Sequence, residues 1–376
     1  MAGLSLRTVL QQRWRRLRPL LLLASTETAA VEGISAAGAT APSRRLTAAA
    51  DAELLLLGPA ARRPHALPPL PAGVSPALIS HVVLQQLGLL PRLQLVDLGC
   101  AVAPAVPHLR LPGPESAGPA RCLSSGAALP AARVQALLAR GACWGRRWPA
   151  DQPLLLAECV PGGTSTALAV RLGLGLAADG LVGGSLLVPA HSLKAQLASQ
   201  GLAAAGLGDR GSAADGQLAQ AVLAAVGDPM QALAAGLCLA LAERQVPVVL
   251  AGGSQMAAVL ALALALAPQE LRPALAEQCL IATTAWLAHE ASSDLALLLR
   301  QLEQRWAVRC QLAVASLRFN GCQSQSLRDF ERGYVKEGVG AGALAWVWEL
   351  SGRSPQDLAN ACDGAAAQLL GPGAQG

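Results

Sequence analysis

The sequence of 376 residues predicts an α/β fold in which helices cover both faces of a mainly parallel sheet. Its recurring unit is a short apolar strand, a glycine-containing turn and a helix rich in Ala and Leu. Residues 154–157 lead into such a turn at 161–166, and residues 246–250 lead into another at 252–255. Continuously apolar strands that alternate with helices are typical of a buried parallel sheet. Ligands bind beyond the carboxyl ends of such strands, so we expect both glycine turns at one edge of the sheet.

Further strands are expected wherever a short apolar run lies between turn residues. These runs are at residues 19–24, after a first helix, and at 93–98, 279–283 and 308–314. Two proline-rich segments, 58–76 and 100–120, interrupt the pattern. Connections of this length usually carry function or are flexible.

The composition excludes several classes of protein. Only 14% of the residues are charged and the mean hydropathy is +0.40, whereas disordered chains are polar and highly charged. The net charge of +5 includes one dense basic run at 13–18, which has no aromatic platform and no recognisable nucleic-acid-binding module around it. We expect this run to form the solvated face of the first helix, and we expect no nucleic-acid partner.

The cysteines indicate neither a metal site nor a redox motif. All nine lie between Cys100 and Cys362, and none forms a Cys-x-x-Cys pair. Metal sites and redox motifs need ligands at short spacings. An odd number of cysteines in an apolar setting is typical of reduced thiols, which predicts a cytoplasmic location.

The longest apolar stretch, residues 246–267, is long enough to span a bilayer. Pro247 near its start, two glycines and a Ser-Gln pair in its middle favour a different interpretation. A strand, a glycine turn and a buried helix explain the stretch better, so we expect no membrane span.

The turn after residues 154–157 is the first candidate site. Glycines let the backbone approach an anion closely, and the following helix directs N–H groups at it. An ordinary helix start with Thr164 or Ser165 as the cap also explains the turn. The glutamate at the strand end is more informative, because a carboxylate is costly to bury without a partner. The candidate residues are Glu158, Gly162, Gly163, Thr164, Ser165 and Thr166.

Two more helix starts carry glycines. At the first, an Asp in the N-cap position followed by Pro explains the sequence without any ligand. At the second, a Gln in the first turn of an apolar helix indicates a ligand contact, although capping explains it equally well. The residues assigned to these turns are Gly227, Asp228, Gly252, Gly253, Ser254 and Gln255.

The segment 333–342 is the most distinctive, because three of its glycines lie beside an acid–base pair. A surface ion pair on a flexible turn is one explanation. In a functional interpretation, Glu337 acts as a general base and Lys336 neutralises an anion. Gly338 and Gly340 would then let the backbone approach the ligand.

Taken in order, these segments resemble the nicotinate-nucleotide:dimethylbenzimidazole phosphoribosyltransferase family, and most closely an uncharacterised branch of it. The resemblance extends from about residue 20 to 350. It rests on Glu158 before Gly-Gly-Thr-Ser-Thr, on Val226-Gly227-Asp228, on residues 246–253 and on the run Lys336-Glu337-Gly338-Val339-Gly340-Ala341.

This resemblance implies a Rossmann-like three-layer αβα fold, a homodimer, and neither a metal nor a dinucleotide cofactor. The chain would form one domain over residues 1–376, with a core at about 75–330 and a smaller helical subdomain built from both chain ends. The implied reaction moves the phosphoribosyl group of nicotinate mononucleotide to a benzimidazole nitrogen and releases nicotinate. Glu337 would be its general base, Glu158 its second carboxylate, and the glycine turns would hold the phosphate.

The sequence departs from the family at the site itself. The first turn has Thr164-Ser165 where the established enzymes have Asn-Thr, and Val335-Lys336 stands where they have Leu-Gly. The acceptor base is therefore either a benzimidazole or a purine such as adenine. A non-catalytic nucleotide-binding protein that retains the fold is the alternative. The Lys336-Glu337 pair favours the transferase, because a binding module needs no general base.

Overall fold

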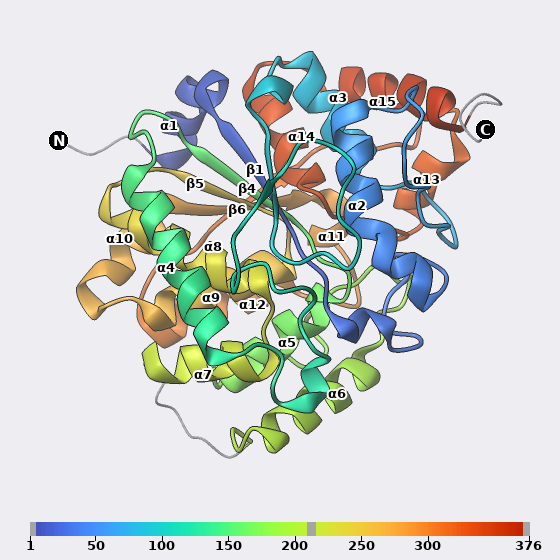
Figure 1. The fold of residues 1–376 in the computed structure, drawn as a ribbon. Helices are drawn as coiled ribbons and strands as arrows, with labels where there is room; N and C mark the ends of the chain where they lie inside the picture. The colour runs from blue at the N-terminus through green and yellow to red at the C-terminus, as the bar shows by residue number, and fades with distance from the viewer. Residues whose placement is uncertain (1–4, 209–215, 371–376) are drawn as a thin grey trace.

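The computed structural model describes residues 5–208 and 216–370, and a seven-stranded sheet lies at its centre (Figure 1). All neighbouring strands are parallel, in the order β3-β2-β1-β4-β5-β6-β7. The strands are β1 (Arg18–Leu23), β2 (Gln94–Asp97), β3 (Leu109–Arg110), β4 (Leu154–Cys159), β5 (Val248–Ala251), β6 (Cys279–Thr284) and β7 (Gln311–Ala315).

The sheet separates two apolar layers, because successive side chains of a strand point to opposite faces. In β1, Leu20 and Leu22 pack into one core, whereas Leu21 and Leu23 pack into the other. This is the three-layer arrangement that the sequence predicts, and it explains why the strands are apolar on both faces.

The first layer holds helices from the middle of the chain, most of which lie below the sheet in Figure 1. They are α4 (Ala131–Arg147), α5 (Gly163–Gly173), α6 (His191–Ala204), α7 (Gly216–Val226), α8 (Pro229–Glu243), α9 (Ser254–Leu266), α10 (Arg272–Gln278) and α12 (Leu295–Trp306).

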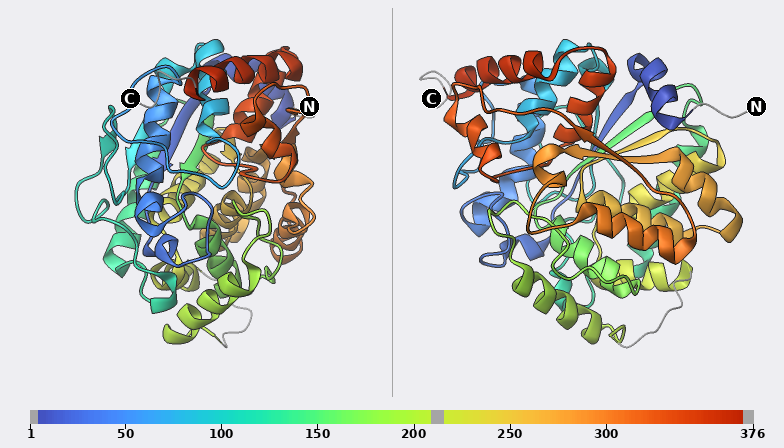
Figure 2. Two further views of the ribbon diagram at one scale, coloured as in Figure 1. Left: turned by 90° about the vertical axis from the view of Figure 1, so that its right-hand side faces the viewer. Right: turned by 180° about the vertical axis from the view of Figure 1, so that it is seen from behind.

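The second layer brings together helices from both chain ends: α14 and α15 pack against α3, and Figure 2 shows the red and blue helices side by side. These helices are α1 (Leu6–Arg13), α2 (Ala41–Leu57), α3 (Ala77–Gln86), α11 (Ala285–Ala288), α13 (Gln325–Glu331), α14 (Ala341–Leu350) and α15 (Pro355–Leu370). The short 3-10 helices are η1 (Trp14–Arg16), η2 (Glu27–Ala30), η3 (Leu90–Arg92), η4 (Leu123–Ser125) and η5 (Gln269–Leu271).

The expected strands are present, with shifts of a few residues at their starts. The largest shift is at β7, which begins at Gln311 and not at Val308, because Ala307 ends α12 in a left-handed conformation and the chain first has to turn back to the sheet. The apolar stretch 246–267 forms β5, a glycine turn and α9, as predicted. Within the described residues, no helix is both long and apolar enough to cross a membrane.

The strand order reverses at β1, which pairs with β2 on one side and with β4 on the other. The carboxyl end of a sheet at such a switch point is where open α/β folds bind their ligands. The turns after β4 and β5 lie at this edge, so the predicted position of both glycine turns is confirmed.

Candidate active site

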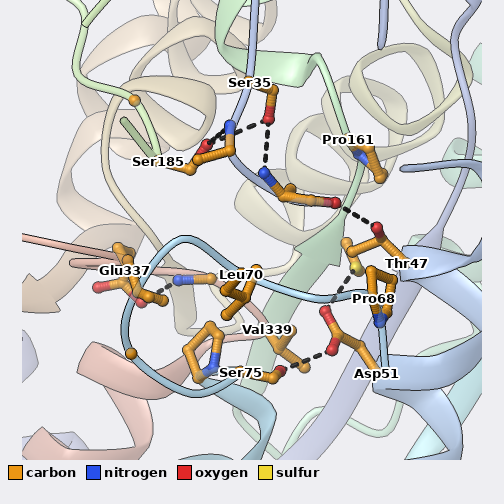
Figure 3. Close-up of a pocket in the computed structure, with 18 of the residues that line it drawn as sticks. Ser35, Thr47, Asp51, Pro68, Leu70, Ser75, Pro161, Ser185, Glu337 and Val339 are labelled. Atoms are coloured by element: carbon orange, nitrogen blue, oxygen red, sulfur yellow. Dashed lines mark hydrogen bonds between the residues drawn. The ribbon is translucent and has the colours of Figure 1, made fainter. Parts of the chain in front are cut away.

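A cavity of about 580 Å³ lies beyond the carboxyl ends of β4 and β5 (Figure 3). The two glycine turns form its floor, and the loop 335–339 forms one side. The proline-rich segment 66–76 and residues 35–37 complete its wall. The cavity is therefore assembled from segments that are far apart in the sequence.

Glu158, the first carboxylate at the cavity, is only 7% exposed. It accepts one hydrogen bond from the Val160 amide (2.8 Å) and one from Gln255 Nε2 (2.8 Å). Burial raises the pKa of Glu158 to about 8, and the nearby charges of Asp228 and Glu337 also raise it. This carboxyl group therefore titrates close to neutral pH and still has free acceptor positions.

Gly163 makes this arrangement possible. A Cβ atom at residue 163 would lie only 1.9 Å from Gln255 Oε1, so a larger residue would displace the Gln255 side chain from Glu158. The Gln255 Oε1 atom itself is buried and has no hydrogen-bond partner. Gln255 thus contacts the carboxylate and does not cap its helix.

Glu337, the second carboxylate, is held by four donors. Its Oε1 accepts from the amides of Gly338 (3.0 Å) and Gly342 (3.1 Å). Its Oε2 accepts from Thr283 Oγ1 (2.9 Å) and from the Thr284 amide (2.9 Å). Desolvation raises the pKa of Glu337, and these four hydrogen bonds oppose the rise. Because a carboxylate offers about four lone-pair positions, all of those on Glu337 are occupied.

The loop that carries Glu337 has an unusual backbone. Val335, Lys336 and Val339 all have positive φ angles, at 64°, 59° and 52°. Such conformations are rare for residues other than glycine, above all for a β-branched valine, and each costs about 1–3 kcal/mol. Backbone strain of this kind concentrates at functional sites, where the surrounding structure holds it in place.

The only two lysines of the chain lie together behind this cavity. Lys336 Nζ pairs with Glu290 and donates to the Leu186 carbonyl, and Lys194 Nζ donates to the Gly183 carbonyl (2.7 Å). Both lysines are buried, and desolvation lowers the pKa of Lys194 to about 8. They hold the loop 183–186, of which Gly183, Gly184 and Ser185 line the cavity.

The explanation of Lys336-Glu337 as a surface ion pair is wrong. Lys336 is 2% exposed and binds Glu290, because its side chain and that of Glu337 leave the strained loop toward different partners. The capping role considered for Thr164 and Ser165 is also not found. Gly162 is the N-cap of α5 and provides no side-chain cap, so both residues lie inside the helix.

The structure brings just over half of the predicted site residues to the cavity wall. Those that line it are Glu158, Gly162, Gly163, Thr164, Gly253, Ser254, Gln255, Glu337 and Gly338. The others, which do not line it, are Ser165, Thr166, Gly227, Asp228, Gly252, Lys336 and Gly340.

Several of these residues support the wall. Asp228 caps α8 as the sequence predicts, and it accepts a hydrogen bond from Thr166 Oγ1 (2.6 Å) in α5. This bond fixes the turn after β4 against α8. Ser254 Oγ accepts from the Gly183 amide (3.1 Å), which joins the turn after β5 to the loop 183–186.

The sequence analysis did not identify three charged residues near the cavity. Asp51 and Arg63 line it from the second layer, and Lys194 lies behind the loop 183–186. The rarity of lysine was a signal for Lys194, whereas Asp51 and Arg63 stand in ordinary helical and proline-rich contexts. Across the part of the chain that the structure describes, no group of His, Cys, Asp and Glu side chains could hold a metal ion.

The fold and the cavity define a Rossmann-like α/β protein with a carboxylate-lined cavity at the end of its sheet. The chain is similar in structure to CobT from Thermus thermophilus, with a TM-score of 0.55 and 18% identity over 97% of this chain and 89% of the other. A crystal structure of nicotinate-nucleotide-dimethylbenzimidazole phosphoribosyltransferase from the same organism gives a TM-score of 0.53 and 18% identity. The match covers 97% of this chain and 88% of the other. At this identity, the similarity establishes the fold.

The chain belongs to the UPF0284 protein family. It is 51% identical over 356 residues to the UPF0284 protein of Parasynechococcus marenigrum strain WH8102. The aligned region covers 93% of this chain and 87% of the relative. A UPF0284 protein of Prochlorococcus marinus strain MIT 9313 is 49% identical over 358 residues, with coverages of 94% and 86%. No family model matches the chain.

Proposed function

We propose that this protein transfers the phosphoribosyl group of nicotinate mononucleotide to an aromatic base, either a benzimidazole or a purine. The products would be an α-linked nucleotide phosphate and nicotinate. The observation that carries the proposal is the pair Glu158 and Glu337, two carboxylates that line one cavity beside two glycine turns. The Rossmann-like fold shared with CobT is in accord with it.

The phosphate would lie where α5 and α9 begin. Neither helix has a side-chain cap at its N-cap residue, Gly162 or Gly253. Helix N-termini favour anions through their N–H groups and their dipole. Behind the loop 183–186 lies a buried group of two lysines and one glutamate, Lys194, Lys336 and Glu290. The group carries two positive charges and one negative charge. A phosphate dianion against this loop would compensate the excess positive charge.

The two carboxylates would divide the chemistry. In the transfer, the bond from the ribose carbon to the nicotinate nitrogen breaks, a nitrogen of the acceptor base bonds to that carbon, and the acceptor loses a proton. Glu158 suits the role of proton acceptor, because it has free acceptor positions and a pKa of about 8. Glu337, whose acceptor positions are filled, suits the role of a fixed negative charge that faces the developing oxocarbenium ion.

Incubation of the purified protein with nicotinate mononucleotide and one acceptor base tests the proposal. We expect release of nicotinate together with one equivalent of an α-linked nucleotide phosphate, both measured by chromatography. Tight binding of the mononucleotide in calorimetry without product for either dimethylbenzimidazole or adenine would instead support the alternative of a non-catalytic nucleotide-binding protein.

The phosphate position has its own test in Lys194→Met. This variant removes one positive charge behind the loop 183–186. We therefore expect it to bind nicotinate mononucleotide at least about 10-fold more weakly than the unmodified protein, as measured by calorimetry. Binding of nicotinate riboside, which lacks the phosphate, should change much less. The control is Arg16→Met, which removes a positive charge from the exposed Arg16–Asp151 pair. These two residues precede β1 and β4, at the opposite edge of the sheet. Equal losses for nucleotide and riboside would contradict this position for the phosphate.

A further inference from the structure

The wall of the cavity on the side of α2 contains a carboxylate that the proposed chemistry does not use. Two polar residues of α2, Thr47 and Asp51, line the cavity there (Figure 3). Thr47 Oγ1 donates its hydrogen bond to the Ala37 carbonyl (2.6 Å). Asp51, which is 5% exposed, is therefore the group that α2 presents to a ligand.

Asp51 has few partners for a buried carboxylate. Its Oδ1 accepts from Ser75 Oγ (2.6 Å), and its Oδ2 contacts only Cys159 Sγ (3.5 Å), a weak donor. Among the described residues, no Lys, Arg or His forms an ion pair with it. Burial raises the pKa of Asp51 to about 6, so the group is mainly ionised at neutral pH. A buried ionised group with so few donors gains from a donor on the ligand.

Apart from Thr47, Arg63 and Ser75, the cavity wall on the side of Asp51 consists mainly of apolar residues. Pro68, Leu70 and Val339 lie near it in Figure 3 and line the same cavity. Cavities of this kind bind flat aromatic groups through their apolar walls, and their few polar groups select the orientation of the ligand. An acceptor in such a wall favours an N–H group on the ring edge that faces it.

Asp51 lies on the other side of β4 from Glu158. Glu158 and Cys159 are consecutive at the end of β4, so their side chains point to opposite faces of the sheet, and Asp51 contacts Cys159. Glu337 also approaches from a different side of the cavity than Asp51 in Figure 3. A ring placed over this strand end would present one edge to Glu158 and Glu337 and its far edge to Asp51.

We propose that Asp51 makes the site selective for an acceptor base that carries an amino group on the edge opposite its attacking nitrogen, as in adenine that attacks through N9. This inference rests on the proposed function. An amino N–H would donate to the free acceptor positions of Asp51. Dimethylbenzimidazole would place methyl groups there and leave the charge unpartnered, and sites built around a polar contact reject ligands that lack it.

Adenine and purine are matched probes, since they differ only in the amino group. We expect calorimetry with the protein in the absence of nicotinate mononucleotide to show adenine binding at least 10-fold more tightly than purine. In Asp51→Asn the ratio should fall to within about 3-fold. The control Asp151→Asn makes the same substitution at the amino end of β4, away from the cavity, and should keep the full ratio.

Two results would overturn the inference: no preference for adenine in the unmodified protein, or an unchanged preference in Asp51→Asn. The first needs no variant, so it applies even if Asp51→Asn does not fold. Turnover of dimethylbenzimidazole without any preference for adenine would refute the inference and leave the proposed function standing. An adenine preference that depends on Asp51, without release of nicotinate from any base, would refute the function and leave the recognition by Asp51 standing.

Discussion

Glu337→Gln is expected to reduce kcat/KM for nicotinate release by about 100- to 1,000-fold, the cost of removing one preorganised electrostatic group. The variant should also lose stability. The amide has one acceptor oxygen where the carboxylate has two, so its NH2 group would face N–H donors, from Gly338 and Gly342 or from Thr284. One unpaired buried donor costs about 1–3 kcal/mol, which urea denaturation would measure as a lower free energy of unfolding.

Glu158→Gln is the matched control for that loss of stability. The buried Gln255 Oε1 has no partner, so a rotation of the Gln255 amide can offer an acceptor to the new NH2 group at residue 158. We therefore expect this variant to unfold at a urea concentration close to that of the unmodified protein. Equal stability of Glu337→Gln and Glu158→Gln would show that the four donors around Glu337 do not hold it as described.

Glu158→Gln is expected to reduce kcat/KM by about 100- to 10,000-fold, the range for loss of a general base. The pH profile identifies the role. A base must be ionised in the free enzyme, and burial raises the pKa of Glu158 to about 8. The kcat/KM of the unmodified protein should therefore rise with pH up to about 8 and level off above it, and the residual activity of Glu158→Gln should lack this limb.

Binding of nicotinate mononucleotide should survive the Glu158 substitution, because the proposed phosphate position uses the starts of α5 and α9. Calorimetry would check this. If Glu158→Gln kept the limb near pH 8 while Glu337→Gln lost it, the proton would go to Glu337, as the resemblance to the phosphoribosyltransferase family implies.

Much of this site follows from local sequence. The strand–turn–helix pattern placed the turns after β4 and β5 at one edge of the sheet, because parallel strands end there together. Glu158 was found because a carboxylate at the end of an apolar strand is costly to bury. Asp228 as an N-cap followed from its position before Pro229, and the capping box confirms it.

Roles that depend on non-local contacts were not predictable in this way. The partner of Lys336 is one example, because Lys336 pairs with Glu290, which is 46 residues away in the sequence. The acceptor positions of Glu337 are filled partly by Thr283 and Thr284, which lie at the end of β6. No spacing rule connects such residues.

The sequence by itself therefore determined the layered fold and the edge of the sheet where the cavity lies, because apolar periodicity and turn residues act over short distances. Only the tertiary structure decided which side chains share the cavity. Asp51 reaches it because α2 packs across the end of β4, a contact between residues 108 positions apart. Burial and partners, which set the charge and the free acceptor positions of each carboxylate, exist only once the layers have packed.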